Sequence, residues 1–128
     1  MSSPEEVVDE FIRRITSNDV ESALELVSAD VEYDNVPVGK NIGPAAMAEF
    51  LAGMATGVDE IEFVVHHQVA RGNVVMNARS DRFRIGDQWL DLPVAGVFEV
   101  NDEGLVTLWR DYFDMASFTD QLTAILGG

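Results

Sequence analysis

The spacing of apolar residues changes once along the chain, near Gly57. Before that residue, apolar side chains mostly recur at intervals of three and four, which predicts helices with one strand among them. After it come four long segments rich in β-branched and aromatic residues, separated by turns that contain Gly or Asn. Helices grouped early and strands grouped late predict an α+β fold.

The start of the first predicted helix is well marked. Ser3 is a suitable N-cap, Pro4 fits the first helical position, and Glu6 can complete a capping box. The apolar positions that follow have helical spacing: Val7, Val8, Phe11, Ile12 and Ile15. We therefore expect an amphipathic helix that packs its apolar side on the rest of the fold.

The other elements follow from breakers and apolar runs. Asn18 and Asp19 end the first helix and can cap a second one. The remaining predictions are a strand at 29–36, a loop at 39–43, a helix from Pro44, strands at 60–70, 74–85, 88–100 and 105–113, and a helix at 115–126. A curved sheet with helices on its concave side would enclose a deep pocket, and Pro93 and Gly96 can help to bend its central strand.

Composition limits the partners and the location. With 128 residues, the chain is expected to form a single domain over residues 1–128. Its net charge of −15 makes nucleic acid and anionic membranes poor partners. No apolar run reaches the ~20 residues of a membrane helix, and the acidic N-terminus lacks the features of a signal peptide. Without cysteine there is no disulfide or thiolate chemistry, which fits a reducing compartment, and a cytoplasmic location is expected.

Three charged residues have apolar neighbours on the same face of their predicted strands: Arg79, Asp81 and Asp111. Side chains alternate along a strand, so Arg79 and Asp81 share a face with Phe83, and Asp111 shares a face with Trp109. A carboxylate among apolar neighbours needs a partner, and Arg79 can serve both acids. The alternatives are a surface ion pair of Arg79 with Asp81 and a solvated edge position for Asp111. Two acids around a cation in an apolar pocket would suit acid–base chemistry.

Four short motifs point to a known family. They are Tyr33-Asp34-Asn35-Val36-Pro37, Arg79-Ser80-Asp81, Gly96-Val97-Phe98 and Trp109-Arg110-Asp111-Tyr112-Phe113-Asp114. Together with the element order, they resemble the limonene-1,2-epoxide hydrolase family. That family lies within a wider group that includes nuclear transport factor 2, ketosteroid isomerase and SnoaL-type polyketide cyclases. The resemblance implies a cone-shaped α+β fold, in which N-terminal helices and a curved mixed β-sheet enclose a deep pocket.

The resemblance also implies a function and a role for each polar residue. In that family a small apolar epoxide is opened by water in one step, without a cofactor, to give a vicinal diol. Asp81 then corresponds to the general acid, Asp111 to the base that activates water, and Arg79 to the bridge between them. Tyr33 and Asn35 correspond to residues that hold the water, although Tyr33 also fits a core position and Asn35 a turn.

The chemistry of these side chains is consistent with that function. Asp81 can donate a proton near neutral pH only if its pKa is raised, and apolar surroundings and a second carboxylate both raise it. The two acids would then share one proton. The sequence has no Cys and no Ser-His-Asp signature, which favours direct attack by water over a covalent route. The alternatives are an isomerase or polyketide cyclase-type enzyme on the same fold, or a non-catalytic small-molecule-binding domain.

The apolar wall of the pocket is predicted from strand parity and from the third helix. The candidates are Phe83, Leu92, Val94, Trp109 and Phe113, joined by Met47 or Leu51. Plain core packing is the alternative for each of them. No metal-binding pattern or phosphate loop occurs. His66 and His67 are adjacent, so a regular strand would point them to opposite faces and prevent them from chelating one metal ion.

The outer face of the sheet is predicted to form a homodimer interface, partly by resemblance. Its predicted apolar residues are Met76, Ala78, Val97, Val106, Leu108 and Tyr112. A monomer would expose them as one patch, and such patches usually mark an interface.

Overall fold

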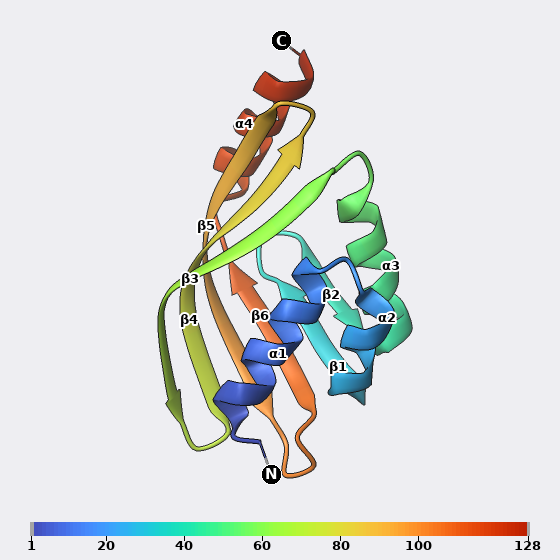
Figure 1. Ribbon diagram of the computed structural model, residues 1–128, viewed down its shortest axis with the longest axis vertical. Coiled ribbons are helices and arrows are strands. Elements are labelled where there is room, and N and C mark those ends of the chain that lie inside the picture. The colour runs from blue at the N-terminus through green and yellow to red at the C-terminus, as the bar shows by residue number, and fades with distance from the viewer. Residues whose placement is uncertain (1, 128) are drawn as a thin grey trace.

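The computed structural model describes residues 2–127 and contains a six-stranded sheet with four α-helices, three of them on its inner side (Figure 1). The elements are α1 (Pro4–Thr16), α2 (Val20–Ala23), a 3₁₀ turn η1 (Leu24–Leu26), β1 (Val27–Asn35), β2 (Gly39–Ile42), α3 (Pro44–Ala55), β3 (Glu60–Arg71), β4 (Val74–Ile85), β5 (Gln88–Val100), β6 (Val106–Tyr112) and α4 (Met115–Gly127). The predicted α+β order is confirmed. None of the helices is long and apolar enough to cross a membrane.

The sheet is mixed, with the strand order β2-β1-β6-β5-β4-β3. The meander from β3 to β6 is antiparallel, as predicted, whereas β1 runs parallel to β6. The predicted loop at 39–43 is wrong, because β2 pairs with β1 there. This edge strand has only four residues. With Lys40 and Asn41 at its centre, its sequence lacks the alternation of apolar and polar residues that predicts a strand.

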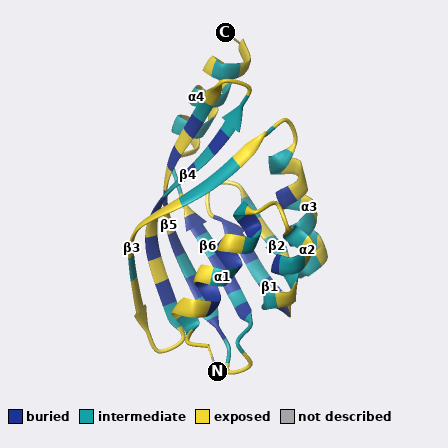
Figure 2. Cartoon of the chain, viewed as in Figure 1, coloured by how far each residue is buried: buried dark blue, intermediate teal, exposed yellow. Residues whose placement is uncertain are grey.

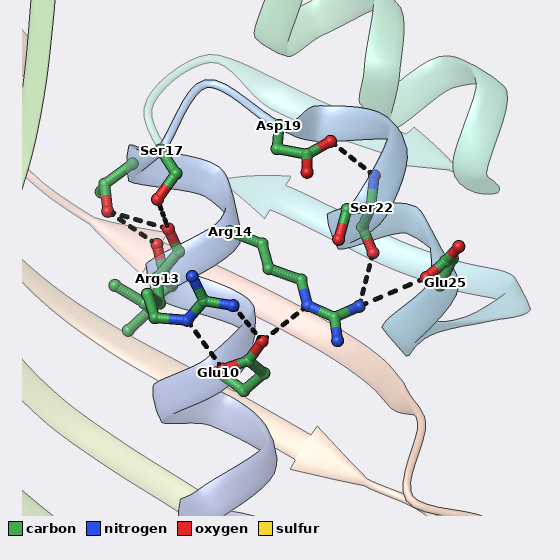
Figure 3. A network of polar contacts seen from close by, with 9 residues as sticks. Glu10, Arg13, Arg14, Ser17, Asp19, Ser22 and Glu25 are labelled. Carbon is green, nitrogen blue, oxygen red and sulfur yellow. Dashed lines mark hydrogen bonds and ion pairs between the residues drawn. The ribbon is translucent and has the colours of Figure 1, made fainter.

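The first helix forms as its sequence predicts. The Ser3 side chain accepts a hydrogen bond from the Glu6 backbone N–H, and Glu6 accepts one from the Ser3 backbone N–H. The predicted apolar side, from Val7 to Ile15, is buried. Arg14 links the exposed side of α1 to α2, because its guanidinium donates to Glu10 and to the Ser22 carbonyl (Figure 3).

Three helices cover the concave inner face of the sheet. α1 contacts β3, β4 and β5, and α3 contacts β1 and β2 (Figure 1). α4 packs mainly on β5, and its Phe118 and Leu122 also pack against the apolar cluster that includes Phe83 of β4, at the end of the molecule opposite the N-terminus. Burial alternates along β4 and β5 (Figure 2), as expected for strands with one face packed against the helices. The core therefore lies between the sheet and the three N-terminal helices.

The central strand β5 accommodates a proline where it has only one neighbour. Pro93 lies opposite Ser80 of β4, but the pairing of β5 with β6 starts only at Ala95. A strand position without a second partner does not need a second backbone hydrogen bond, so proline is tolerated there. Beyond this point β3, β4 and β5 continue without β6, and α4 packs beside this extension (Figure 1).

One predicted outer-face residue lies on the inside. Val106 is fully buried in the core beside Val100, because the pairing of β5 with β6 shifts between Glu99 and Val100. Because of this irregularity, the Val106 side chain points to the inner face, opposite to the face that strict alternation assigns to it. Leu108 and Tyr112 keep the predicted outer orientation, but only Tyr112 is exposed, because Leu108 is buried.

Candidate active site

Arg79 bridges the two acids that the sequence singles out. Its Nε and Nη2 atoms donate to Oδ1 and Oδ2 of Asp81, each at 2.9 Å, and Nη2 also donates to Oδ2 of Asp111 at 2.9 Å. The exposed fractions are 2% for Arg79, 5% for Asp81 and 4% for Asp111. The surface ion pair and the solvated edge position are both excluded. A buried acid–cation–acid group results.

Strand register explains why these side chains meet. Asn77 on β4 lies opposite Gly96 on β5, Gly96 lies opposite Asp111 on β6, and Asp111 lies beside Asn35 on β1. These four residues thus form one row across four neighbouring strands, facing the interior. Arg79 follows two residues after Asn77 on the same face, so its guanidinium can reach back to the row.

The Arg79 guanidinium also contacts two aromatic rings and an amide side chain. Its carbon atom lies 5.0 Å from the ring centre of Phe63 and 5.9 Å from that of Phe98. Its remaining polar edge donates from Nη1 to Oδ1 of Asn77 at 2.9 Å. Asn77 in turn donates to Gln68, and Gln68 donates to Asp9 on α1. The arginine is therefore oriented by a chain of amides that reaches the surface.

The two acids sit where protonation is favoured. Burial raises the pKa of Asp81 to about 6, against the opposing effect of Arg79. Burial also raises the pKa of Asp111, while Arg79 and the Trp109 N–H act to lower it. For Arg79, burial alone would lower the pKa, but Asp111 and Asp81 outweigh it, so the guanidinium stays charged.

Tyr33 and Asn35 line the same cavity from β1. The Tyr33 ring stacks on Trp109 with centroids 4.3 Å apart. Burial and the charge of Asp111 raise the pKa of Tyr33, so its hydroxyl keeps its proton. The Nδ2 atom of Asn35 is buried and has no hydrogen-bond partner among the described residues. An unpaired buried donor beside a carboxylate is suited to hold a small polar ligand.

The polar group lies in a largely apolar cavity of about 220 Å³. Of the predicted wall, the residues that line it are Phe83, Leu92, Val94, Trp109, Phe113 and Leu51. Met47 does not line it; this residue is fully buried in the main core, one helical turn before Leu51. Exposed Val38 and Met115 also belong to the lining, so the cavity opens between the β1–β2 turn and the start of α4.

Comparison with known proteins assigns the family. The model of the limonene-1,2-epoxide hydrolase catalytic domain matches residues 2–124. The chain belongs to the limonene-1,2-epoxide hydrolase family. A curated member, "Epoxide hydrolase EphG" of Mycobacterium tuberculosis (strain ATCC 25618 / H37Rv), is 34% identical over 108 residues, or 84% of this chain and 71% of that protein.

Solved structures agree with the family and with the wider fold group. The structure of an M. tuberculosis LEH-like epoxide hydrolase has a TM-score of 0.77 and 31% identity, and the match covers 94% of this chain and 92% of that one. A putative SnoaL-like polyketide cyclase from Shewanella denitrificans OS-217 has a TM-score of 0.84 at 19% identity, over 94% and 97%. That second likeness concerns the fold alone. The predicted family and fold class are confirmed.

Three features of this family member's site escaped the sequence analysis. Asn77 shares the inner face with Arg79 and Asp81, so strand parity alone would have found it. The Nε1 atom of Trp109 donates to Oδ1 of Asp111 at 2.9 Å, which makes Trp109 more than an apolar wall.

Gly96 is the third such feature. A Cβ atom there would lie 2.3 Å from Nη1 of Arg79, and 2.9 Å from both Oδ1 of Asn77 and Oδ1 of Asp111. Its backbone is not in the left-handed region, so the glycine serves close approach rather than a turn.

The two histidines lie away from the cavity. Both are exposed, and Nε2 of His66 is 2.8 Å from the Ser80 hydroxyl. The strand is irregular there, because the pairing of β3 with β4 shifts between Val65 and His67. Within residues 2–127, no group of three His, Asp or Glu side chains is arranged to hold a metal ion.

Proposed function

We propose that this protein is an epoxide hydrolase that adds water to a small apolar epoxide in one step and releases a vicinal diol. The observation that carries the proposal is the pair of buried carboxyl groups joined by Arg79 inside an apolar cavity. A pair of acids whose pKa values are raised by burial can hold one proton between them near neutral pH. Ring opening requires one acid and one base, and this pair supplies both.

Asp81 is the proposed acid and Asp111 the proposed base. Each carboxylate oxygen has two lone pairs, so Asp81 can carry a proton while both of its oxygens accept from Arg79. Asp81 gives that proton to the epoxide oxygen as the carbon–oxygen bond breaks. Asp111 takes a proton from the water whose oxygen bonds to the same carbon. The pair therefore holds one proton before and after the reaction, and the cycle closes when it returns to Asp81.

The attacking water is proposed to sit between Asp111, Asn35 and Tyr33. The unpaired Nδ2 of Asn35 donates to the water oxygen, which leaves a water hydrogen free to point at Asp111. The Tyr33 hydroxyl keeps its proton, and its oxygen accepts the other water hydrogen, which leaves one lone pair of the water free to attack the epoxide carbon. Since water, two carboxyls and a fixed cation complete the step, we propose that no cofactor takes part.

The wall of the cavity favours an uncharged hydrocarbon epoxide. Its ionisable side chains are Asp81, Asp111 and Tyr33, all proposed to act in the reaction itself. No residue of the lining is cationic, so an anionic substrate group would find no partner there.

Incubation with styrene oxide, cyclohexene oxide and limonene oxide tests the proposal directly. We expect the corresponding vicinal diol from at least one of them, detected by chiral chromatography. Turnover of a ketosteroid or a polyketide in place of every epoxide would show an isomerase or cyclase. A protein that binds the epoxides without turning any of them over would be a binding domain, and the proposal would be wrong.

We expect the rate to fall above pH 6. Asp81 must be protonated, and its pKa is raised to about 6, so raising the pH through that value removes the proton that the epoxide needs. The loss should approach tenfold per pH unit. On the acid side Asp111 gains a proton, and burial raises its pKa, which moves the acid side of the profile to higher pH than for an exposed aspartate. A pH profile of kcat/KM checks this, and a rate that climbs steadily to pH 9 would contradict the roles of the two acids.

We also propose that two copies pair through the outer face of the sheet. Met76 is 49% exposed, and a shallow groove there is lined by Val69, Ala78, Val97 and Tyr112. Light scattering should then give about 28 kDa, twice the 14.1 kDa chain. Met76→Asp should weaken the pairing by placing a charge in the patch, whereas Thr119→Asp on α4 should not. A monomeric mass at high concentration would refute the interface.

A further inference from the structure

A second cavity, of about 250 Å³, lies beside the catalytic cavity and between the end of α3 and α4. Met54, Phe83 and Phe118 line both cavities, so these three side chains form the partition between them. Phe83 follows Asp81 by two residues on the same face of β4, which places the partition about 7 Å from the acid along the strand.

The lining of the second cavity is suited to hydrocarbon. Val58, Ile85, Leu90 and Leu122 belong to it, and it contains no ionisable residue. Its one side-chain hydroxyl, that of Thr56, already donates to the Ala52 carbonyl, so a charged ligand would lose its hydration there with little in return. An apolar chain would gain free energy in proportion to the surface that it buries.

The α4 side of the partition and of the outer wall is only partly buried. Phe118 and Leu122 come from α4 and are only partly buried, although they pack against the cluster around Phe83 and Leu90. α4 packs mainly on β5, where the Gln121 side chain hydrogen-bonds to the backbone N–H and to the carbonyl of Asp91. Met54 is unbranched and adaptable. Small movements of two partition side chains would join the cavities.

We propose that the second cavity receives the apolar tail of the epoxide substrate, while the epoxide ring lies at Asp81 and Asp111. Each cavity alone is smaller than the ~300 to 1,000 Å³ of typical small-molecule sites, whereas the two together fall inside that range. This inference rests on the proposed function and extends it: the substrate class is an epoxide with a hydrocarbon chain longer than roughly 7 Å.

Chain-length series of terminal epoxides test the inference. We expect kcat/KM to rise about fourfold for each methylene added once the tail passes the partition, the ratio that burial of one methylene gives. The probes are 1,2-epoxybutane, 1,2-epoxyhexane, 1,2-epoxyoctane and 1,2-epoxydecane. Leu122→Trp fills the second cavity from α4 and should abolish the rise for the longer members. Thr123→Trp adds the same side chain on an exposed position of the same helix and should preserve it.

A second variant distinguishes the effect of filling the cavity from an effect of damage to α4. Val58→Phe fills the cavity from the opposite wall and should also abolish the rise. A flat series in the unmodified protein, or an unchanged rise in both filled variants, would overturn the inference. If no epoxide is turned over, the proposed function fails instead, and calorimetric binding of 1,2-decanediol against 1,2-butanediol then decides the second cavity. Equal affinity for the two diols, or tighter binding of decanediol that both fillings leave unchanged, would overturn it.

Discussion

Replacing either acid by its amide should reduce kcat by at least ~10²-fold, the scale of general acid–base catalysis. In Asp81→Asn the epoxide oxygen loses its proton donor, and in Asp111→Asn the water loses its base. Both substitutions preserve the shape of a side chain that is almost completely buried, so the protein should fold and its circular dichroism should be unchanged. Steady-state kinetics on a compact epoxide measures the effect.

The double variant tells whether the two acids act as a unit. Asp81→Asn with Asp111→Asn should be little worse than the more impaired single variant, because the one-step reaction already fails when one partner is missing. Asp102→Asn, in the exposed turn between β5 and β6, removes the same charge and should keep full activity. Near-normal turnover by either single variant would remove that residue from the mechanism.

Adding one methyl group at Gly96 should be almost as damaging. The new Cβ would lie 2.3 Å from Nη1 of Arg79, so the guanidinium must move by roughly 1 Å to restore van der Waals contact. A displacement of that size at a positioned group can cost ~10²-fold in rate. Because Arg79 sets the distance between the two acids, Gly96→Ala should lower kcat far more than it changes KM.

The matched control for Gly96 is its neighbour on the same strand. Ala95→Ser also adds one atom to β5, but on the exposed face that points away from Arg79. It should leave kcat within about twofold, since exposed substitutions of this kind disturb a fold little. If Gly96→Ala retained full activity with an unchanged pH profile, the close contact of β5 with the guanidinium would not matter for catalysis.

Much of the fold could be predicted because local signals agreed with one another. The capping box at Ser3 and the turn residues between β3, β4 and β5 fix element ends within a residue or two. The failures have physical causes. β2 is a short edge strand without an apolar pattern, and the inward position of Val106 depends on an irregularity of pairing that alternation cannot reveal.

The polar residues of the site were predictable, but their contacts were not. Parity placed Arg79 and Asp81 on one face, yet only the register of the three strands β4, β5 and β6 brings Asn77, Gly96 and Asp111 into one row. For Gly96 the sequence suggested a bend, whereas the structure shows a close approach of side chains that a single sequence does not encode. On α3, helical spacing alone could not separate Met47 in the core from Leu51 at the cavity.

A single turnover in water enriched in oxygen-18 tests the central claim most directly. With the enzyme in excess over a compact epoxide, the diol is collected and its mass is measured. Direct attack by water, activated by Asp111, predicts one labelled oxygen in every diol molecule of this first turnover. A covalent route, in which an enzyme carboxylate opens the ring, would transfer an unlabelled carboxylate oxygen to the diol and leave the label in the protein. Unlabelled diol from the first turnover would contradict one-step hydrolysis by the Asp81–Arg79–Asp111 group.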